Sequence, residues 1–392
     1  MESTKKLMRI LYLVNSGQPG GVEQYILDLV KGLGSGDNKV FTWCAQGPIV
    51  RWYKDAGATV SVKKINFDID PFYIIDLVTF LKTNKIDVVH ANELKVGINA
   101  MIATKLAKTK CCVTHVHTPI SQWKTTGSFR NLFTKVENFV YSVFVNLLSD
   151  TEIALTQTIK QVKFSEGIRK EKLIVIPNGL DHSKFEFSQD VKNRYRAEIL
   201  NRYKIPIDSV VIGNIGRMTQ EKGHQILLEA FSKLKASKNI GSNVKLLLAG
   251  GGQLEEKYRN FVKENRLEKE IFITGVFENE DNIKMYASLD IFIFPSEAEG
   301  FGIVLLEGML SGVPVISSDL EVLKEVGCNE VVYFITGDSD SLADAILRIL
   351  SLNRGRRSEV AKKLGTHVRN NYGMEKFVES YKKLYEGIIL RA

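Results

Sequence analysis

Short runs rich in Val and Ile alternate along the chain with stretches of helical period, and the alternation occurs in two series. This pattern is typical of a parallel β-sheet with helices on both faces. Between the series, residues 180–208 are polar, charged and poor in apolar periodicity, and they follow the turn Pro177–Gly179. The pattern predicts an α/β protein with two doubly wound parallel-sheet domains, residues 1–200 and 201–373. The expected strands are Met8–Val14, Thr59–Ile65, Asp87–Ala91, Cys111–His117, Ile153–Thr156, Leu173–Ile176, Val210–Ile215, Lys245–Ala249, Ile271–Thr274, Ile291–Phe294, Val313–Ser317 and Val332–Ile335.

The composition is that of an ordinary globular chain. Its 392 residues exceed what one hydrophobic core accommodates, 44% of them are hydrophobic, and no apolar run approaches the roughly 20 residues of a membrane span. Lys5, Lys6 and Arg9 precede a short apolar run without a small-residue cleavage site, so we expect a first buried strand rather than a signal peptide. The four cysteines show no C-x-x-C spacing, which favours a reducing cytoplasm over a zinc site or a disulfide framework.

The positive charge lies in the first half of the chain. Residues 1–180 hold 23 Lys and Arg against 15 Asp and Glu, whereas residues 181–392 hold 30 of each. Between Glu93 and Glu137 there are seven basic residues and no acidic one. The same stretch contains the aromatic residues Trp123, Phe129 and Phe133. This mixture suits an anionic membrane surface, and an ordinary solvated basic face is the alternative. No nucleic-acid-binding motif accompanies the charge, so we do not expect nucleic acid as a partner.

Glycines follow the first expected strand. Residues 15–21 read NSGQPGG and lead into a helix with one apolar face. Gly20 and Gly21 would let backbone N–H groups approach an anion such as phosphate. The segment is not G-x-G-x-x-G, so the nicotinamide-type fingerprint is missing, and an ordinary tight turn remains the alternative.

Two cations follow the first strand of the second series. The segment RMTQEKGH, residues 217–224, places Arg217 and Lys222 around a turn at the carboxyl edge of the expected sheet. Two positive charges there would neutralise a diphosphate and stabilise the charge that grows as it leaves. Solvated surface cations are the alternative.

Two glutamates follow the strand Ile291–Phe294. Glu299 lies in the turn of FPSEAEGFG, residues 294–302, and Glu307 lies eight residues later on a helix. Carboxylates accept hydrogen bonds from paired sugar hydroxyls, as in ribose recognition by dinucleotide folds. Glu307 has apolar neighbours, so it needs a partner unless it is a surface residue.

Two histidines end a strand of the first series. Strand alternation sends His115 and His117 to the same side of the sheet. The pair could ligate a metal, but no acidic cluster or D-x-D motif accompanies it, and a structural role for His117 is a further alternative.

Together these segments resemble family 4 of the retaining glycosyltransferases. The motif R-x4-K-G occurs at Arg217–Gly223 and P-S-x-x-E-G-F-G at Pro295–Gly302. The resemblance implies a GT-B fold, in which two Rossmann-like domains face a cleft, and it covers nearly the whole chain. Further matching segments are Gly20–Glu23, Ile176–Asp181 and Gly312–Ser317. Two segments depart from the family pattern, AGGGQ at 249–253 in place of G-D-G and Asp319–Glu325 in place of Gly-Gly-x-x-E.

The resemblance also implies residue roles. Arg217 and Lys222 would bind the diphosphate of a nucleotide sugar such as a UDP-sugar, and Glu307 would bind the ribose hydroxyls. Glu299 would hold the donor sugar together with backbone N–H groups of Gly300, Phe301 and Gly302. The first domain would contribute His117 to the donor sugar and Gly20 and Gly21 to the phosphates. The implied catalytic residues are His117, Glu299, Arg217 and Lys222.

The implied reaction is transfer of a sugar with retention to a lipid-linked or growing surface polysaccharide, without a metal or other cofactor. We expect a cytoplasmic protein that associates peripherally with the inner face of the cytoplasmic membrane, and a last helix, 374–392, that packs back on the first domain. Two alternatives are a sugar-nucleotide 2-epimerase of the same fold and a non-catalytic nucleotide-binding subunit of a transferase complex.

Overall fold

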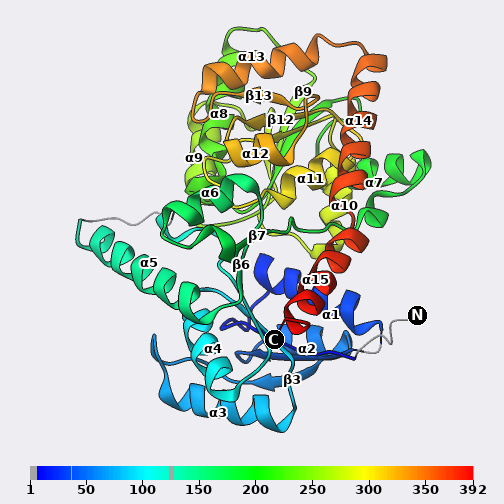
Figure 1. The fold of residues 1–392 in the computed structure, drawn as a ribbon. Coiled ribbons are helices and arrows are strands. Elements are labelled where there is room, and N and C mark those ends of the chain that lie inside the picture. Colours follow the sequence, from blue (N-terminus) through cyan, green and yellow to red (C-terminus); the bar gives the residue numbers. More distant parts are fainter. Residues whose placement is uncertain (1–6, 37, 123–127, 392) are drawn as a thin grey trace. The chain divides into compact units, whose positions relative to one another are not determined.

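A computed structural model describes the chain except for residues 1–6, 37, 123–127 and 392. The chain forms two compact units (Figure 1). The first unit comprises residues 1–179 and 374–392, and the second comprises residues 180–373. Among the described residues, no helix is long and apolar enough to cross a membrane.

The first unit is built on a seven-stranded sheet of order β3-β2-β1-β4-β5-β6-β7, in which every pair of neighbouring strands is parallel. The six strands expected there are present. The sequence missed β2, which has five buried residues but reads KVFTWC and contains no run of Val and Ile. The strands are β1 (Arg9–Leu13), β2 (Lys39–Cys44), β3 (Thr59–Val62), β4 (Val88–Asn92), β5 (Cys111–His115), β6 (Thr151–Ala154) and β7 (Leu173–Val175).

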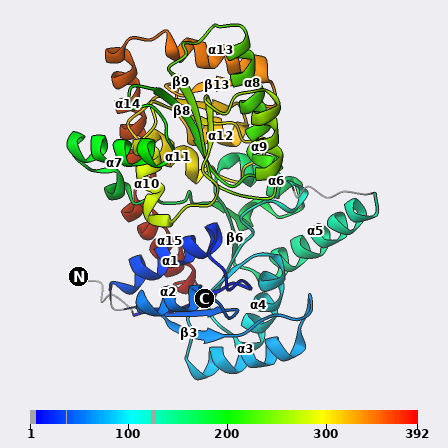
Figure 2. The same cartoon turned by 180° about the vertical axis from the view of Figure 1, so that it is seen from behind.

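Helices cover both faces of this sheet because the buried side chains of its strands alternate. Ile10 and Tyr12 of β1 pack with α1, α2 and α15, whereas Leu11 and Leu13 pack with α3 and α4. α5 lies beside α4 (Figure 2). The helices of this unit are α1 (Gly21–Gly34), α2 (Ile49–Asp55), α3 (Pro71–Thr83), α4 (Leu94–Ala107), α5 (Ser128–Leu148), α6 (Gln157–Ser165) and α15 (Met374–Ile389).

The second unit has a six-stranded sheet of order β10-β9-β8-β11-β12-β13, again with parallel neighbours. All six strands expected in the second series are present. They are β8 (Val210–Ile215), β9 (Val244–Ala249), β10 (Ile271–Ile273), β11 (Ile291–Phe294), β12 (Val315–Ser318) and β13 (Val332–Phe334). The helices are α7 (Gln189–Arg202), α8 (His224–Ala236), α9 (Glu255–Glu264), α10 (Asn282–Ala287), α11 (Ile303–Leu310), α12 (Glu321–Val326), α13 (Ser339–Leu350) and α14 (Arg354–Tyr372).

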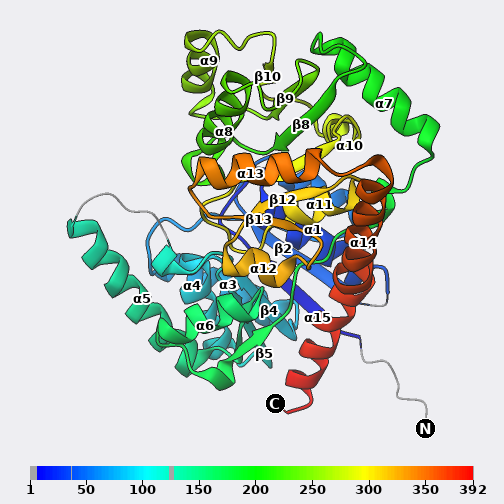
Figure 3. The same cartoon turned by 90° about the horizontal axis from the view of Figure 1, so that it is seen from above.

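The boundary between the units differs from the expected position near residue 200, because α7 belongs to the second unit. It packs against α10 (Figure 3). Arg196 of α7 donates to Ser288 O at 2.5 Å and to the carboxylate of Asp290 at 3.0 Å. The polar sequence of α7 hid this attachment, since the bonds involve residues about ninety positions away.

The C-terminal helix α15 lies in the first unit, against α1. Its aromatic residues Phe377, Tyr381 and Tyr385 are buried. Tyr385 OH lies 2.7 Å from Nδ1 of His90 on β4, and Phe377 and Tyr381 both contact the ring of Tyr25 on α1. The last helix thus packs on the first unit, as expected from the sequence.

Candidate functional site

Each sheet has a switch point, where the chain leaves neighbouring strands in opposite directions. In the second sheet it lies between β8 and β11, which are adjacent although the strand number jumps by three. In sheets of this kind, ligands bind in the crevice outside the carboxyl ends of the strands at the switch point. The loop after β8 carries Arg217 and Lys222, and the loop after β11 carries Glu299. The two segments chosen from the sequence are therefore brought together.

The two loops touch directly. The N–H of Glu297 donates to Glu221 O at 2.8 Å. Gly223 has φ +66°, and a Cβ on it would lie 1.9 Å from Pro295 O. Gly223 is thus required both by its backbone conformation and by the close approach of the second loop. This contact holds Lys222 against the segment that carries Glu299.

Lys222 and Glu299 form an ion pair at this edge. Lys222 Nζ lies 2.5 Å from Glu299 Oε1, and the hydroxyl of Ser296 donates to the same oxygen at 2.8 Å. The side chains are 21% and 11% exposed, so both can still reach a ligand. Arg217 is exposed and forms no ion pair with any described residue, which leaves its guanidinium available.

The segment Gly300–Gly302 leads into the N-terminus of α11. The side chain of Phe301 is buried and meets the ring of Tyr372 edge-on, so only its backbone faces the edge. In the described part of the chain, the N–H groups of Gly300, Phe301 and Gly302 donate no hydrogen bond. Free N–H groups before a helix attract anionic and hydroxyl oxygen atoms.

Glu307 has the partner that its apolar surroundings require. Tyr286 OH of α10 donates to Glu307 Oε2 at 2.8 Å. Burial raises the pKa of Glu307, although the Tyr286 hydrogen bond and the charge of Lys184 oppose the shift. The structure does not join Glu307 to the Lys222–Glu299 pair by any described contact. Tyr286 was missed from the sequence because it lies 21 residues away on another helix.

The glycines of the loop after β9 pack against the loop after β8 at the same edge of the sheet. Gly250 has φ +139°, and a Cβ on it would lie 2.0 Å from Gly216 O in the loop after β8. The N–H of Met218 donates to Gly251 O at 2.8 Å. The AGGGQ segment, which departs from the family pattern, therefore still has glycine where the neighbouring loop approaches closely.

In the first sheet, the switch point lies between β1 and β4. His117 follows β5, which ends at His115 and not at His117 as expected. The His115 and His117 rings stack at 3.7 Å, in accord with the alternation argument, and Tyr25 meets His117 edge-on at 4.9 Å. Burial, and then the electrostatic interactions with Lys163 and His90, hold the pKa of His117 well below its usual value. His117 is therefore a neutral imidazole.

Asn92 determines which nitrogen of His117 carries the proton. Asn92 Nδ2 donates to Leu13 O at 3.3 Å, so its Oδ1 is the atom that lies 3.1 Å from His117 Nε2. An amide oxygen only accepts, so Nε2 must be the protonated nitrogen. Nδ1 is then left as a hydrogen-bond acceptor. Asn92 was missed from the sequence, where nothing in its neighbourhood marks it.

Gly20 and Gly21 begin α1. Gly20 is the N-cap residue in an extended conformation, and a Cβ on Gly21 would meet no atom within 4 Å. The tight approach in this loop instead involves Gly17, where a Cβ would lie 2.1 Å from Gln46 O in the loop after β2. Packing therefore requires glycine at position 17, whereas the space beside Gly21 is open. Among the described residues, no group of three or more His, Cys, Asp or Glu side chains could hold a metal.

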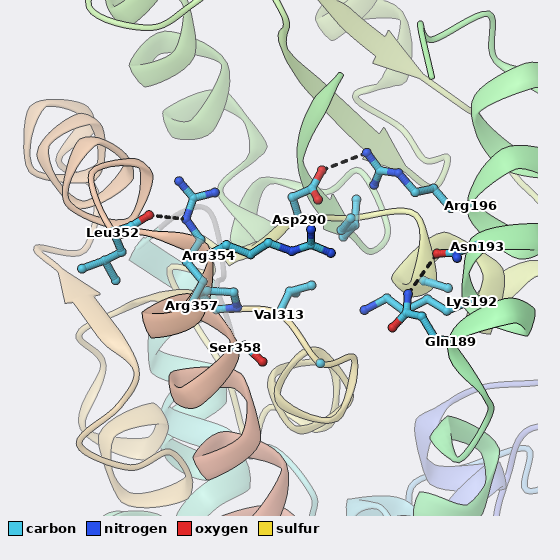
Figure 4. Close-up of a pocket in the computed structure, with 14 residues that line it drawn as sticks. Gln189, Lys192, Asn193, Arg196, Asp290, Val313, Leu352, Arg354, Arg357 and Ser358 are labelled. Carbon is cyan, nitrogen blue, oxygen red and sulfur yellow. Dashed lines mark hydrogen bonds and ion pairs between the residues drawn. The ribbon is translucent and has the colours of Figure 1, made fainter. Parts of the chain in front are cut away.

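A basic cavity of about 570 Å³ lies elsewhere in the second unit (Figure 4). It borders Asp290 and Pro314, which precede β11 and β12, so it lies at the opposite edge of the sheet from Lys222. Three of its cations bond to carbonyl groups at or directly after helix C-termini: Lys192 to Ser311 O, Arg196 to Ser288 O and Arg357 to Leu350 O. Cations stabilise helix C-termini, so these charges have a structural role.

Both halves of the chain match models of known families. Residues 19–184 match "Glycosyltransferase Family 4", and residues 196–370 match "Glycosyl transferases group 1". The chain is 25% identical over its full length and that of the relative to an Escherichia coli UDP-Gal:alpha-D-GlcNAc-diphosphoundecaprenol alpha-1,3-galactosyltransferase. It is 21% identical to the E. coli O-antigen biosynthesis glycosyltransferase WclY, over 97% of this chain and 99% of that protein.

Solved structures share the fold. Anabaena HepE in complex with UDP superposes with a TM-score of 0.83 at 20% identity, over 97% of this chain and 100% of that one. A glycosyltransferase from Rickettsia africae superposes with a TM-score of 0.82 at 21% identity, over 98% of this chain and 100% of that one.

Proposed function

Because the chain belongs to the glycosyltransferases described by the family 4 and group 1 models, with two Rossmann-like units of the GT-B fold, we propose that it transfers a sugar from a UDP-sugar to a lipid-linked or growing surface polysaccharide. The names of the relatives support this choice: one acts on a diphosphoundecaprenol-linked sugar, one serves O-antigen biosynthesis, and one structural neighbour binds UDP. The single observation that carries the proposal is the meeting of Lys222 and Glu299 at the switch point of the second sheet.

In this reaction, Arg217 and Lys222 bind the diphosphate and stabilise the negative charge that grows on it as the sugar departs. Glu299, held by Lys222 and Ser296, accepts hydrogen bonds from hydroxyl groups of the donor sugar. The backbone N–H groups of Gly300–Gly302 donate hydrogen bonds to the same sugar. Glu307 binds the ribose hydroxyls. In the first unit, Nδ1 of His117 is an acceptor for a sugar hydroxyl, and Gly21 leaves open space beside α1.

We assign the reaction as retaining and independent of a metal ion. Both carboxylates proposed to touch the donor are engaged by other side chains, Glu299 by Lys222 and Glu307 by Tyr286, so neither is placed as a free nucleophile for a covalent intermediate. The acceptor then attacks from the face that the diphosphate leaves. The positive charge comes from Arg217 and Lys222.

The experiment is incubation of the protein with a panel of sugar nucleotides, with and without membrane extract. Release of nucleoside diphosphate and the mass of the product identify the donor and the acceptor. Transfer that continues in excess EDTA supports the proposal that side-chain cations, and not a metal ion, stabilise the departing diphosphate. An anomeric configuration in the product that matches that of the donor supports retention. An acceptor-independent change of sugar stereochemistry would contradict the proposal and favour an epimerase.

We also propose that the first unit contacts an anionic membrane. α5 exposes Val136, Phe139, Val143 and Leu147, whose spacings of three and four residues place them on one helix face. The exposed Lys135 lies beside this stripe, and such a mixture favours an anionic bilayer surface. Three aromatic residues named from the sequence lie outside the side chains that the structure describes: Trp123, Phe129 and Phe133.

Vesicle sedimentation tests this contact. We expect binding to phosphatidylglycerol vesicles that falls at least about fivefold in Phe139→Glu, because a carboxylate at the interface is repelled and costly to bury. Val276→Glu is the matched control, since Val276 is 86% exposed in the second unit. Equal losses in both variants, or none, would contradict the assignment.

A further inference from the structure

Glu93, the residue after β4, has a backbone conformation that favours glycine. Its φ is +74° and its ψ is +159°. Residues other than glycine adopt this region only with strain. In the described part of the chain, five other non-glycine residues have positive φ, all between 50° and 57°, and each follows the end of a helix. They are Lys85, Lys108, Lys204, Lys238 and Arg266. Such strain concentrates at functional sites.

No structural role of the Glu93 side chain explains this strain. Glu93 is the N-cap residue of α4, yet its carboxylate accepts no hydrogen bond from the helix. The carboxylate receives one long bond, from the N–H of Asn15 at 3.4 Å, and forms no ion pair with a described residue. The backbone bonds to His115 and Gly97 would be available to any residue at this position. Glycine would fit this backbone conformation better, and no described contact of the Glu93 carboxylate offsets the strain.

The carboxylate lies at the edge that the proposed reaction uses. β4 and β1 flank the switch point of the first sheet, and Asn15 belongs to the loop after β1. Asn92, which precedes Glu93, bonds to His117. Burial raises the pKa of Glu93, opposed by the Asn15 hydrogen bond. A half-buried carboxylate with so few bonds is stabilised by any hydroxyl donor that reaches it.

We propose that Glu93 binds the acceptor substrate: its carboxylate accepts a hydrogen bond from a hydroxyl of the acceptor sugar and orients that sugar at the first sheet. The inference rests on the proposed glycosyltransferase function. A carboxylate repels phosphate groups, so Glu93 suits a neutral polyhydroxyl ligand better than a phosphate.

The test compares Glu93→Gly, Glu93→Ala and Lys108→Gly with the wild type. Glu93→Gly removes both the strain and the carboxylate, and Glu93→Ala removes only the carboxylate. Lys108→Gly relieves an ordinary positive φ of 57° far from the edge and is the control. Three quantities are measured for each: the melting temperature, the Kd for UDP, and the KM for the acceptor in a total membrane-lipid extract, with the donor saturating.

We expect Glu93→Gly to melt about 1–4 °C above the wild type because strain is relieved, and Glu93→Ala to melt at or below it. Both Glu93 variants should raise the acceptor KM at least about tenfold, with the UDP Kd within about twofold of the wild type. The Lys108→Gly variant should keep the wild-type KM.

Two results would overturn the assignment. A Glu93→Gly variant that melts lower and keeps a normal acceptor KM would make Glu93 a structural residue. A UDP Kd that weakens as much as the acceptor KM would place Glu93 on the donor. Failure of the proposed function is distinct, because the wild type would then bind no UDP and transfer no sugar.

Discussion

The two sheets carry their charges in different places. In the second unit, Lys222 and Glu299 lie partly exposed at the carboxyl edge, in loops of which one also carries the exposed Arg217. In the first unit, the corresponding edge presents the neutral imidazole of His117 and the amide of Asn92, whereas an ion pair between Lys163 and Glu152 is buried, 1% and 0% exposed. The second unit thus places a cation at the carboxyl edge of its sheet, whereas the first unit buries the cation of its ion pair within the framework.

The buried pair is hydrogen-bonded to three further groups. Glu152 accepts from the N–H of Val116 at 3.0 Å and from Tyr141 OH at 2.8 Å, in addition to Lys163. Lys163 also donates to Ile153 O at 2.8 Å. Val116 directly precedes His117, so this network fixes the backbone that carries the His117 side chain.

The largest effect should come from breaking that network. Lys163→Met should cost about 3–5 kcal/mol of unfolding free energy, because it leaves Glu152 buried without its counter-charge. Denaturant unfolding measures the loss. Lys160→Met on the same helix is the control, and Lys163→Met combined with Glu152→Leu should recover part of the loss. If Lys163→Met costs no more than Lys160→Met, the charge in the first unit is not structural.

Removing the edge charge should affect rate rather than stability. Lys222→Ala should lower turnover about 10²–10³-fold, because the negative charge that grows on the departing diphosphate loses the positive charge that stabilises it. Nucleoside diphosphate release with the preferred donor measures it. Lys233→Ala is the control, since Lys233 bonds to Asp340 on the surface of the same unit. Near-normal turnover of Lys222→Ala with an unchanged melting temperature would remove Lys222 from the mechanism.

A carboxylate placed beside His117 tests whether the neutral imidazole is needed. In Asn92→Asp, a carboxylate beside Nε2 should raise the pKa of His117 toward neutrality, so that acidification protonates Nδ1 and removes its acceptor function. Turnover should then fall about tenfold between about pH 8 and pH 6, whereas the wild type shows no such limb from His117. Asn92→Ala is the control without added charge. A flat pH profile in Asn92→Asp would refute the assigned role of the neutral imidazole.

The smallest effect concerns Glu307. Its raised pKa means that the folded state binds the proton more tightly, so its contribution to stability is present at low pH and is lost as the pH rises through the folded pKa. Glu307→Gln should therefore raise the melting temperature at pH 8 by about 1–3 °C, with little change at pH 4, and weaken UDP binding. A variant that melts lower at pH 8 would contradict this.

Much of the fold followed from the sequence, because buried parallel strands are continuous apolar runs. β2 was missed since its residues, with Lys39 and Thr42, do not form such a run. Lys222 and Glu299 could be selected from the sequence because both lie in loops directly after strands, and the structure brings the two side chains into contact. Tyr286, Asn92 and the strain at Glu93 could not be found, since they depend on contacts and dihedral angles that only the folded chain sets.

Above all, we propose that the carboxyl edge of the second sheet binds a diphosphate through Arg217 and Lys222. Calorimetric affinities for UDP and uridine test it most directly, in the wild type and in the double variant Arg217→Gln, Lys222→Gln. We expect the wild type to prefer UDP to uridine at least about a hundredfold and the double variant to lose most of that preference, because hydrogen bonds to charged groups contribute about 1.5–3 kcal/mol each. An undiminished preference for UDP in the double variant would contradict the account.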